Sequence, residues 1–74
     1  MRTGNAVREV MKLKQIGVNQ LADLMGKTHR LVSERLGQEN ISVKKLNEML
    51  RVMGYKTIIV PRDTRIPSDS FEIE

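Results

Sequence analysis

The placement of glycine constrains this chain more than any other feature of its sequence. Five glycines interrupt the 74 residues, at positions 4, 17, 26, 37 and 54. Glycine reaches left-handed backbone conformations without steric cost, so it commonly marks helix ends and turns. Each segment between these glycines is long enough for two or more helical turns. The spacing therefore predicts one small domain of short packed helices, with no internal repeat.

Apolar residues recur at helical spacing in four successive segments. The predicted helices cover residues 6–15, 18–25, 28–36 and 43–54, with Thr3 or Asn5, Thr28 and Ser42 as expected N-caps. The short link Gly26-Lys27 favours a steep crossing of the second and third helices. The predicted stripes contain Val7, Val10, Met11 and the stem of Lys14; Leu21, Ala22, Leu24 and Met25; Leu31, Val32, Arg35 and Leu36; and Val43, Leu46, Met49, Leu50 and Met53. The predicted core is Val10, Leu21, Ala22, Leu24, Val32, Leu36, Leu46, Leu50 and Met53.

The pattern changes after Gly54. Residues 55–60 are rich in β-branched and apolar side chains and end at Pro61, which predicts a C-terminal β-strand. Residues 71–74 alternate apolar and acidic side chains, which is typical of a second short strand or of a frayed tail. A lone strand leaves backbone groups unpaired. Its partner is either residues 71–74 or the same strand of a second copy, and we expect the second, a homodimer with an interface of Tyr55, Thr57, Ile58, Ile59 and Val60.

Charge is distributed unevenly along the chain. The formal net charge is +4, from 13 Lys and Arg against 9 Asp and Glu. Residues 1–62 hold twelve basic and five acidic residues, or +7, whereas residues 63–74 hold one basic and four acidic residues, or −3. A basic body favours a polyanionic partner. The sequence is thus divided into a body at 1–54 and a strand with an acidic tail at 55–74.

Cysteine is absent, which excludes disulfides, thiolate nucleophiles and Cys-based zinc sites. No apolar run approaches the roughly 20 residues of a membrane span. The N-terminus is not followed by an apolar stretch of the kind that a signal peptide contains. We therefore expect a cytoplasmic protein without a membrane partner.

The segment from Leu21 to Thr28, Leu-Ala-Asp-Leu-Met-Gly-Lys-Thr, followed by Val32-Ser33, resembles the helix-turn-helix of the phage-repressor and Cro superfamily (XRE-like). The resemblance covers residues 6–54. It implies a mainly α fold, a four-helix helix-turn-helix domain of lambda-repressor-like type, to which the residue pattern after Gly54 adds a C-terminal β-strand extension. It also implies a small transcriptional regulator, typically a repressor, that binds double-stranded DNA.

Two departures from the family pattern limit what the resemblance transfers. This chain has Gly17 and Val18 where the family usually has Ser or Thr followed by Gln, so the phosphate contact of that Gln does not transfer to Val18; Asn19 or Gln20 could replace it. The family often continues with a fifth helix after the position of Gly54, where this sequence predicts a strand. Neither departure changes the fold assignment.

The third helix is the expected recognition helix. Such a helix places its N-terminal residues against base edges in the major groove, so the candidate base-contacting residues are His29, Arg30, Ser33 and Glu34. Helix N-termini and flanking polar residues supply contacts to the DNA backbone. These candidates are Asn19, Gln20, Lys27, Thr28, Gln38, Asn40 and Lys44. We expect the Thr28 hydroxyl mainly to cap its helix.

An enzyme is not expected. The chain has one His, no Cys, no glycine-rich phosphate loop and no paired carboxylates in an apolar setting, so no catalytic residue, metal ligand or cofactor is predicted. One alternative is an antitoxin-type protein, whose acidic tail, with Phe71 and Ile73 as anchors, binds a toxin. A second alternative is a dimerisation scaffold of the same fold that lacks affinity for DNA.

Overall fold

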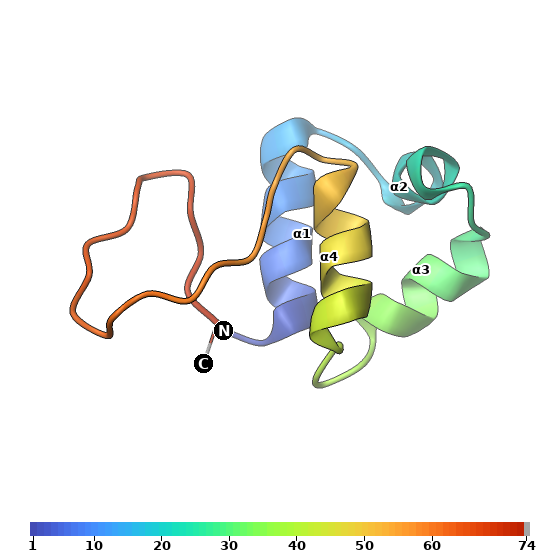
Figure 1. Ribbon diagram of the computed structural model, residues 1–74. Helices are drawn as coiled ribbons and strands as arrows, with labels where there is room; N and C mark the ends of the chain where they lie inside the picture. Colours follow the sequence, from blue (N-terminus) through green and yellow to red (C-terminus); the bar gives the residue numbers. More distant parts are fainter. Residues whose placement is uncertain (74) are drawn as a thin grey trace.

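Four α-helices make up the body of the protein. The computed structural model describes residues 1–73, and its helices are α1 (Thr3–Lys14), α2 (Val18–Met25), α3 (His29–Leu36) and α4 (Val43–Arg51). Helices α1 and α4 lie side by side, with α2 and α3 on one side of this pair and the loop formed by the C-terminal residues on the other (Figure 1). The prediction of a mainly α fold with four helices is confirmed.

Helix α1 begins earlier than predicted, at Thr3, with Arg2 in the N-cap position. Neither expected cap residue has that role. The Thr3 side chain is buried, and its hydroxyl oxygen accepts a 2.8 Å hydrogen bond from the backbone N–H of Ile41. This side chain therefore joins the start of α1 to the loop before α4.

Helices α2 and α3 have the predicted bounds, apart from the placement of Thr28 as the cap of α3. Gly26 ends α2 in the left-handed conformation, with φ of 68°. The Thr28 hydroxyl accepts a 3.2 Å hydrogen bond from the backbone N–H of Leu31, so Thr28 is the N-cap. Figure 1 shows α2 nearly end-on and α3 running across the view, so the two helices cross at a steep angle.

Helix α4 starts as predicted but ends at Arg51, three residues before the expected end at Gly54. The Ser42 hydroxyl accepts a 3.3 Å hydrogen bond from the Lys45 N–H and caps the helix. At the other end the Tyr55 N–H donates to the Leu50 carbonyl, across a turn in which Gly54 has φ of 81°. Residues 52–54 therefore form a turn that closes α4.

The core lies where the four helices meet, and it contains eight of the nine predicted residues. The exception is Leu24, which is 55% exposed because the two turns of α2 bury only the face that carries Leu21 and Ala22. Val43 is also exposed, since it lies in the first turn of α4, and the Lys14 stem is exposed too. The main buried cluster comprises Val7, Val10, Met11, Leu21, Ala22, Val32, Leu36, Ile41, Leu46, Met49, Leu50 and Met53.

The predicted strand at residues 55–60 is absent: residues 52–73 contain no strand. A strand needs a neighbour to pair with, and residues 1–73 provide none. Residues 71–73 do not pair with residues 55–60; instead Phe71 and Ile73 pack against the helical core. The prediction of a strand within one chain is therefore wrong, and pairing between two copies stays a prediction. Glu74 lies outside the described residues.

Candidate nucleic-acid interface

Helix α3 has one buried face and one exposed polar face. Val32, Arg35 and Leu36 are buried against the other helices. The four candidate base-contacting residues, His29, Arg30, Ser33 and Glu34, are all exposed. The C-terminal loop lies on the far side of α1 and α4 from α3 (Figure 1), so it does not cover these side chains. The sequence prediction thus identified the exposed face of α3 correctly.

Side chains on this face interact in pairs one helical turn apart. The Nε of Arg30 donates a 3.1 Å hydrogen bond to a carboxylate oxygen of Glu34, and the two form an ion pair. The Ser33 hydroxyl lies 3.5 Å from Nδ1 of His29. Exposed pairs of this kind contribute little free energy, about 1 kcal/mol or less. Breaking the Arg30–Glu34 pair so that each side chain can bind an external partner therefore costs little free energy.

The start of α2 presents Asn19 and Gln20, both exposed. The side-chain oxygen of Gln20 accepts a 2.7 Å hydrogen bond from the backbone N–H of Gly17. This bond holds the Gln20 amide at the N-terminus of α2 and leaves its NH₂ group as a donor, the kind of group that binds a phosphate oxygen. The sequence predicts Gln20 as a phosphate contact, but its hydrogen bond to the N-cap residue Gly17 was not predicted.

The remaining candidates bracket α3. Lys27 and Thr28 precede the helix, Gln38 and Asn40 follow it, Lys44 lies in the first turn of α4, and all five are exposed. The segment that follows α3 is fixed to α1 by two contacts besides the Thr3–Ile41 bond. Arg2 and Glu39 form an ion pair at 3.9 Å, and Gly4 lies against the carbonyl groups of Leu36 and Gln38. The segment after α3 is thus held by the N-terminal part of the protein.

An ion pair that sequence reasoning missed joins α3 to α4. A guanidinium nitrogen of Arg35 donates a 3.0 Å hydrogen bond to a carboxylate oxygen of Glu48. The Arg35 side chain is only 10% exposed, and its Nε is buried without a hydrogen-bond partner among the described residues. The hydrogen bond from Arg35 lowers the pKa of Glu48. This pair helps to fix the orientation of α3.

Comparison of the chain with protein families, with curated proteins and with solved structures finds no match. No helix within residues 1–73 is long and apolar enough to cross a membrane. Within the same residues, no three His, Asp or Glu side chains gather in an arrangement that could hold a metal ion.

Proposed function

We propose that this protein is a small sequence-specific regulator of transcription, a repressor of the phage-repressor and Cro type, that binds double-stranded DNA through α3. One observation carries the proposal. The short α2–turn–α3 unit presents four adjacent polar side chains on the outer face of α3, while the opposite face of that helix is anchored in the core. An exposed helix of this size fits the major groove of B-form DNA.

The chemistry of the four side chains suits base recognition. The Arg30 guanidinium can donate two parallel hydrogen bonds to O6 and N7 of guanine, and the Glu34 carboxylate can accept one from N4 of cytosine. Ser33 can donate or accept, and His29 can donate to N7 or O6. In the free protein these groups satisfy one another through the Arg30–Glu34 and His29–Ser33 pairs, which DNA binding would replace.

Contacts to the phosphate backbone would come from the residues that bracket α3. The exposed candidates are Asn19, Gln20, Lys27, Thr28, Gln38, Asn40 and Lys44. Only Lys27 and Lys44 among them are cationic, and the net charge of +7 over residues 1–62 adds attraction at longer range. Affinity for DNA should therefore fall as the salt concentration rises.

We propose that the regulator acts as a homodimer joined through residues 55–60. Ile58, Ile59 and Val60 are exposed, and Ile59 is fully so. Within residues 1–73 no backbone N–H of residues 56–60 donates to another backbone group. A second copy could pair with this segment about a two-fold axis and cover its apolar side chains. Tyr55 and Thr57 already have partners in the same chain, Asp69 and Asn47.

The antitoxin-type alternative has less support. It requires the acidic tail to offer Phe71 and Ile73 to a protein partner, but both side chains are half-buried against the helical core of their own chain. The Tyr55 hydroxyl also donates a 3.0 Å hydrogen bond to the Asp69 carbonyl, which holds the tail in this position. Capture of a toxin would first require these contacts to break.

Selection of bound fragments from a random duplex pool tests the proposed function. The expected result is enrichment of one motif, with two half-sites about 10 base pairs apart if the protein binds as a dimer. The same selection with a variant that carries His29→Ala, Arg30→Ala and Ser33→Ala together should lose the motif. Recovery of unenriched sequences by the wild-type protein would overturn sequence-specific binding.

A further inference from the structure

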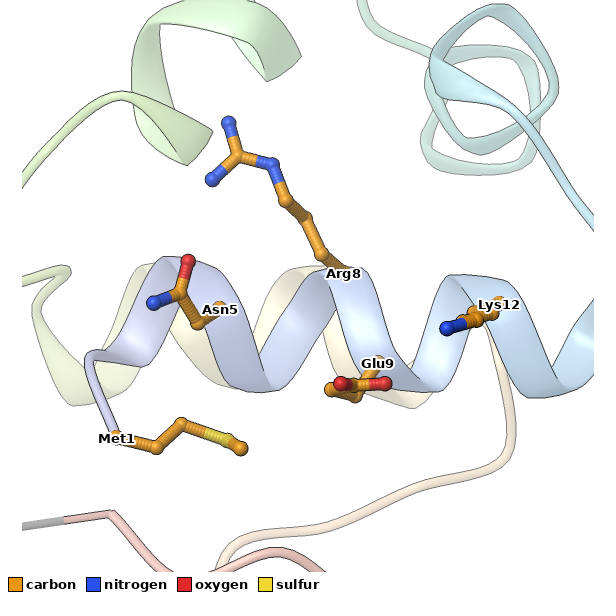
Figure 2. Close-up of a pocket in the computed structure, with 5 residues that line it drawn as sticks. All are labelled: Met1, Asn5, Arg8, Glu9 and Lys12. Atoms are coloured by element: carbon orange, nitrogen blue, oxygen red, sulfur yellow. The ribbon is translucent and has the colours of Figure 1, made fainter.

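A strip of polar side chains on α1 is not used by any of the contacts described above. Asn5, Arg8 and Lys12 follow one another at helical spacing, and all three are exposed. They line a shallow hollow together with Met1 and Glu9. In Figure 2 the Arg8 side chain extends from α1 toward the green ribbon of α3, whereas Asn5, Glu9 and Lys12 lie on the near face of the helix and Met1 lies below its start.

This strip is continuous with the segment that follows α3. A second shallow hollow is lined by Met1, Arg2, Asn5, Glu39 and Asn40, so it shares Met1 and Asn5 with the first. Gly4, one helical turn before Arg8, lies against the carbonyl groups of Leu36 and Gln38. The edge of α1 that carries Arg8 therefore adjoins the end of α3 and the two proposed phosphate contacts Gln38 and Asn40.

The two cations of the strip have no partner among residues 1–73. Arg8 and Lys12 form no ion pair or hydrogen bond with any other residue in the part of the chain that the structure describes. Arg2, by contrast, is neutralised by Glu39 at 3.9 Å. The nearest acid in sequence, Glu9, lines the same hollow (Figure 2), but within residues 1–73 it forms no ion pair with Arg8 or Lys12. The hollow thus contains two cations and one acid, and its net charge is positive.

We propose that Arg8 and Lys12 are phosphate contacts that extend the DNA interface from α3 along α1. This inference rests on the proposed function. A helix in the major groove is flanked on each side by a phosphate backbone, so residues beside the end of α3 face a row of phosphates. Arg8 binds one phosphate of the DNA backbone through its guanidinium, and Lys12 binds the next phosphate. Asn5 supplies an uncharged hydrogen-bond donor. These contacts position the protein on the duplex without reading its sequence.

The test is the salt dependence of binding to the selected duplex and to a scrambled one. Each lost phosphate contact lowers the slope of log K against log salt by about 0.9. Arg8→Gln and Lys12→Gln should each lower the slope by that amount on both duplexes, and the double variant by about twice as much. Arg65→Gln is the matched control, because it removes the same charge from an exposed position in the C-terminal segment, which forms the loop on the other side of α1 and α4 from α3 (Figure 1).

The outcomes separate this inference from the proposed function. A wild-type protein that binds neither duplex overturns both. In another outcome, the wild-type protein binds the selected duplex, but Arg8→Gln and Arg65→Gln give equal slopes of log K against log salt. This result overturns the role of α1 and leaves the role of α3 intact. Thermal unfolding of each variant should match wild type, because the replaced side chains are exposed and form no ion pair with another of the residues that the structure describes.

Discussion

The Arg35 guanidinium in α3 donates a hydrogen bond to the Glu48 carboxylate in α4 over a distance of 3.0 Å. These residues stand 13 positions apart in sequence, and their bond ties the proposed recognition helix to the most strongly amphipathic helix of the body. Because the Arg35 side chain is nearly buried, removal of its partner leaves a buried charge without compensation. The pair therefore contributes both to stability and to the orientation of α3.

The first prediction is a pH dependence of stability that comes from Glu48. The pKa of Glu48 in the folded protein lies below its ordinary value of 4.5, chiefly because Arg35 donates a hydrogen bond to the carboxylate. The stabilisation is then present above pH 4.5 and is lost as the pH falls through the lower, folded-state pKa. Urea unfolding of wild type and Glu48→Gln should show a difference near pH 7 that shrinks toward pH 3. A difference that stays constant over this range would refute the coupling.

The second prediction concerns the close approach of α1 to the end of α3. A Cβ added to Gly4 would lie 2.6 Å from the carbonyl oxygen of Leu36, which is backbone and cannot move aside cheaply. Gly4→Ala should lower the free energy of unfolding by about 1–3 kcal/mol, despite the better helix propensity of Ala. Gly17→Ala is the control: its φ is −96° and its Cβ meets only the end of the Gln20 side chain, at 4.0 Å. The control should change stability by less than about 0.5 kcal/mol, because the lower unfolded-state entropy of Ala offsets its weaker preference for the N-cap position that Gly17 occupies. Equal losses for both variants would contradict the tight contact at Gly4.

The third prediction compares two leucines, both of which the sequence pattern assigned to the core. Leu46 is buried at the centre of the cluster, and Leu46→Ala should cost about 2–5 kcal/mol. Leu24 is largely exposed, and Leu24→Ala should change stability by only about 0.5 kcal/mol. Denaturant midpoints measure both. Similar shifts for the two variants would mean that α2 packs in another orientation.

Local sequence signals account for most of the fold. Thr28 and Ser42 were predicted as caps, and Gly26 as a helix end, because capping depends on residues within one turn of each other. Leu24 shows the limit of this reasoning: periodicity locates an apolar stripe, but which part of it is covered depends on the neighbouring helices. The prediction of a strand at residues 55–60 was wrong for a similar reason, because β-pairing requires a partner that the local sequence does not specify.

The candidate site was predictable to a similar degree. The exposed face of α3 follows from its periodicity, so the exposure of His29 and Arg30 was predictable, whereas their contact with bases stays a prediction. The Arg35–Glu48 pair could not be predicted from the sequence, because nothing in the local pattern marks two residues 13 positions apart as partners. Arg8 was not among the predicted contacts either, since its proximity to the end of α3 depends on the packing of α1 at Gly4.

The fourth prediction is that the protein is a dimer in solution. Light scattering at tens of micromolar should give a mass near 17 kDa, twice the 8.5 kDa of one chain. Ile59→Lys should reduce this mass to that of the monomer, because it places a charge in the proposed apolar interface. Ile66→Lys is the control, since Ile66 is an exposed isoleucine outside residues 55–60. A wild-type protein that is monomeric at this concentration would exclude the proposed dimer.

The most direct measurement is the effect of Arg30→Ala on discrimination between two duplexes, the selected motif and the same motif with one base pair changed. Binding is followed by fluorescence anisotropy at fixed salt concentration. If α3 reads bases, Arg30→Ala loses about 1–3 kcal/mol of discrimination at one base pair, whereas Lys27→Ala weakens binding to both duplexes alike. If Arg30→Ala instead weakens binding to both duplexes equally, as Lys27→Ala should, Arg30 does not read a base and the proposed role of α3 is contradicted.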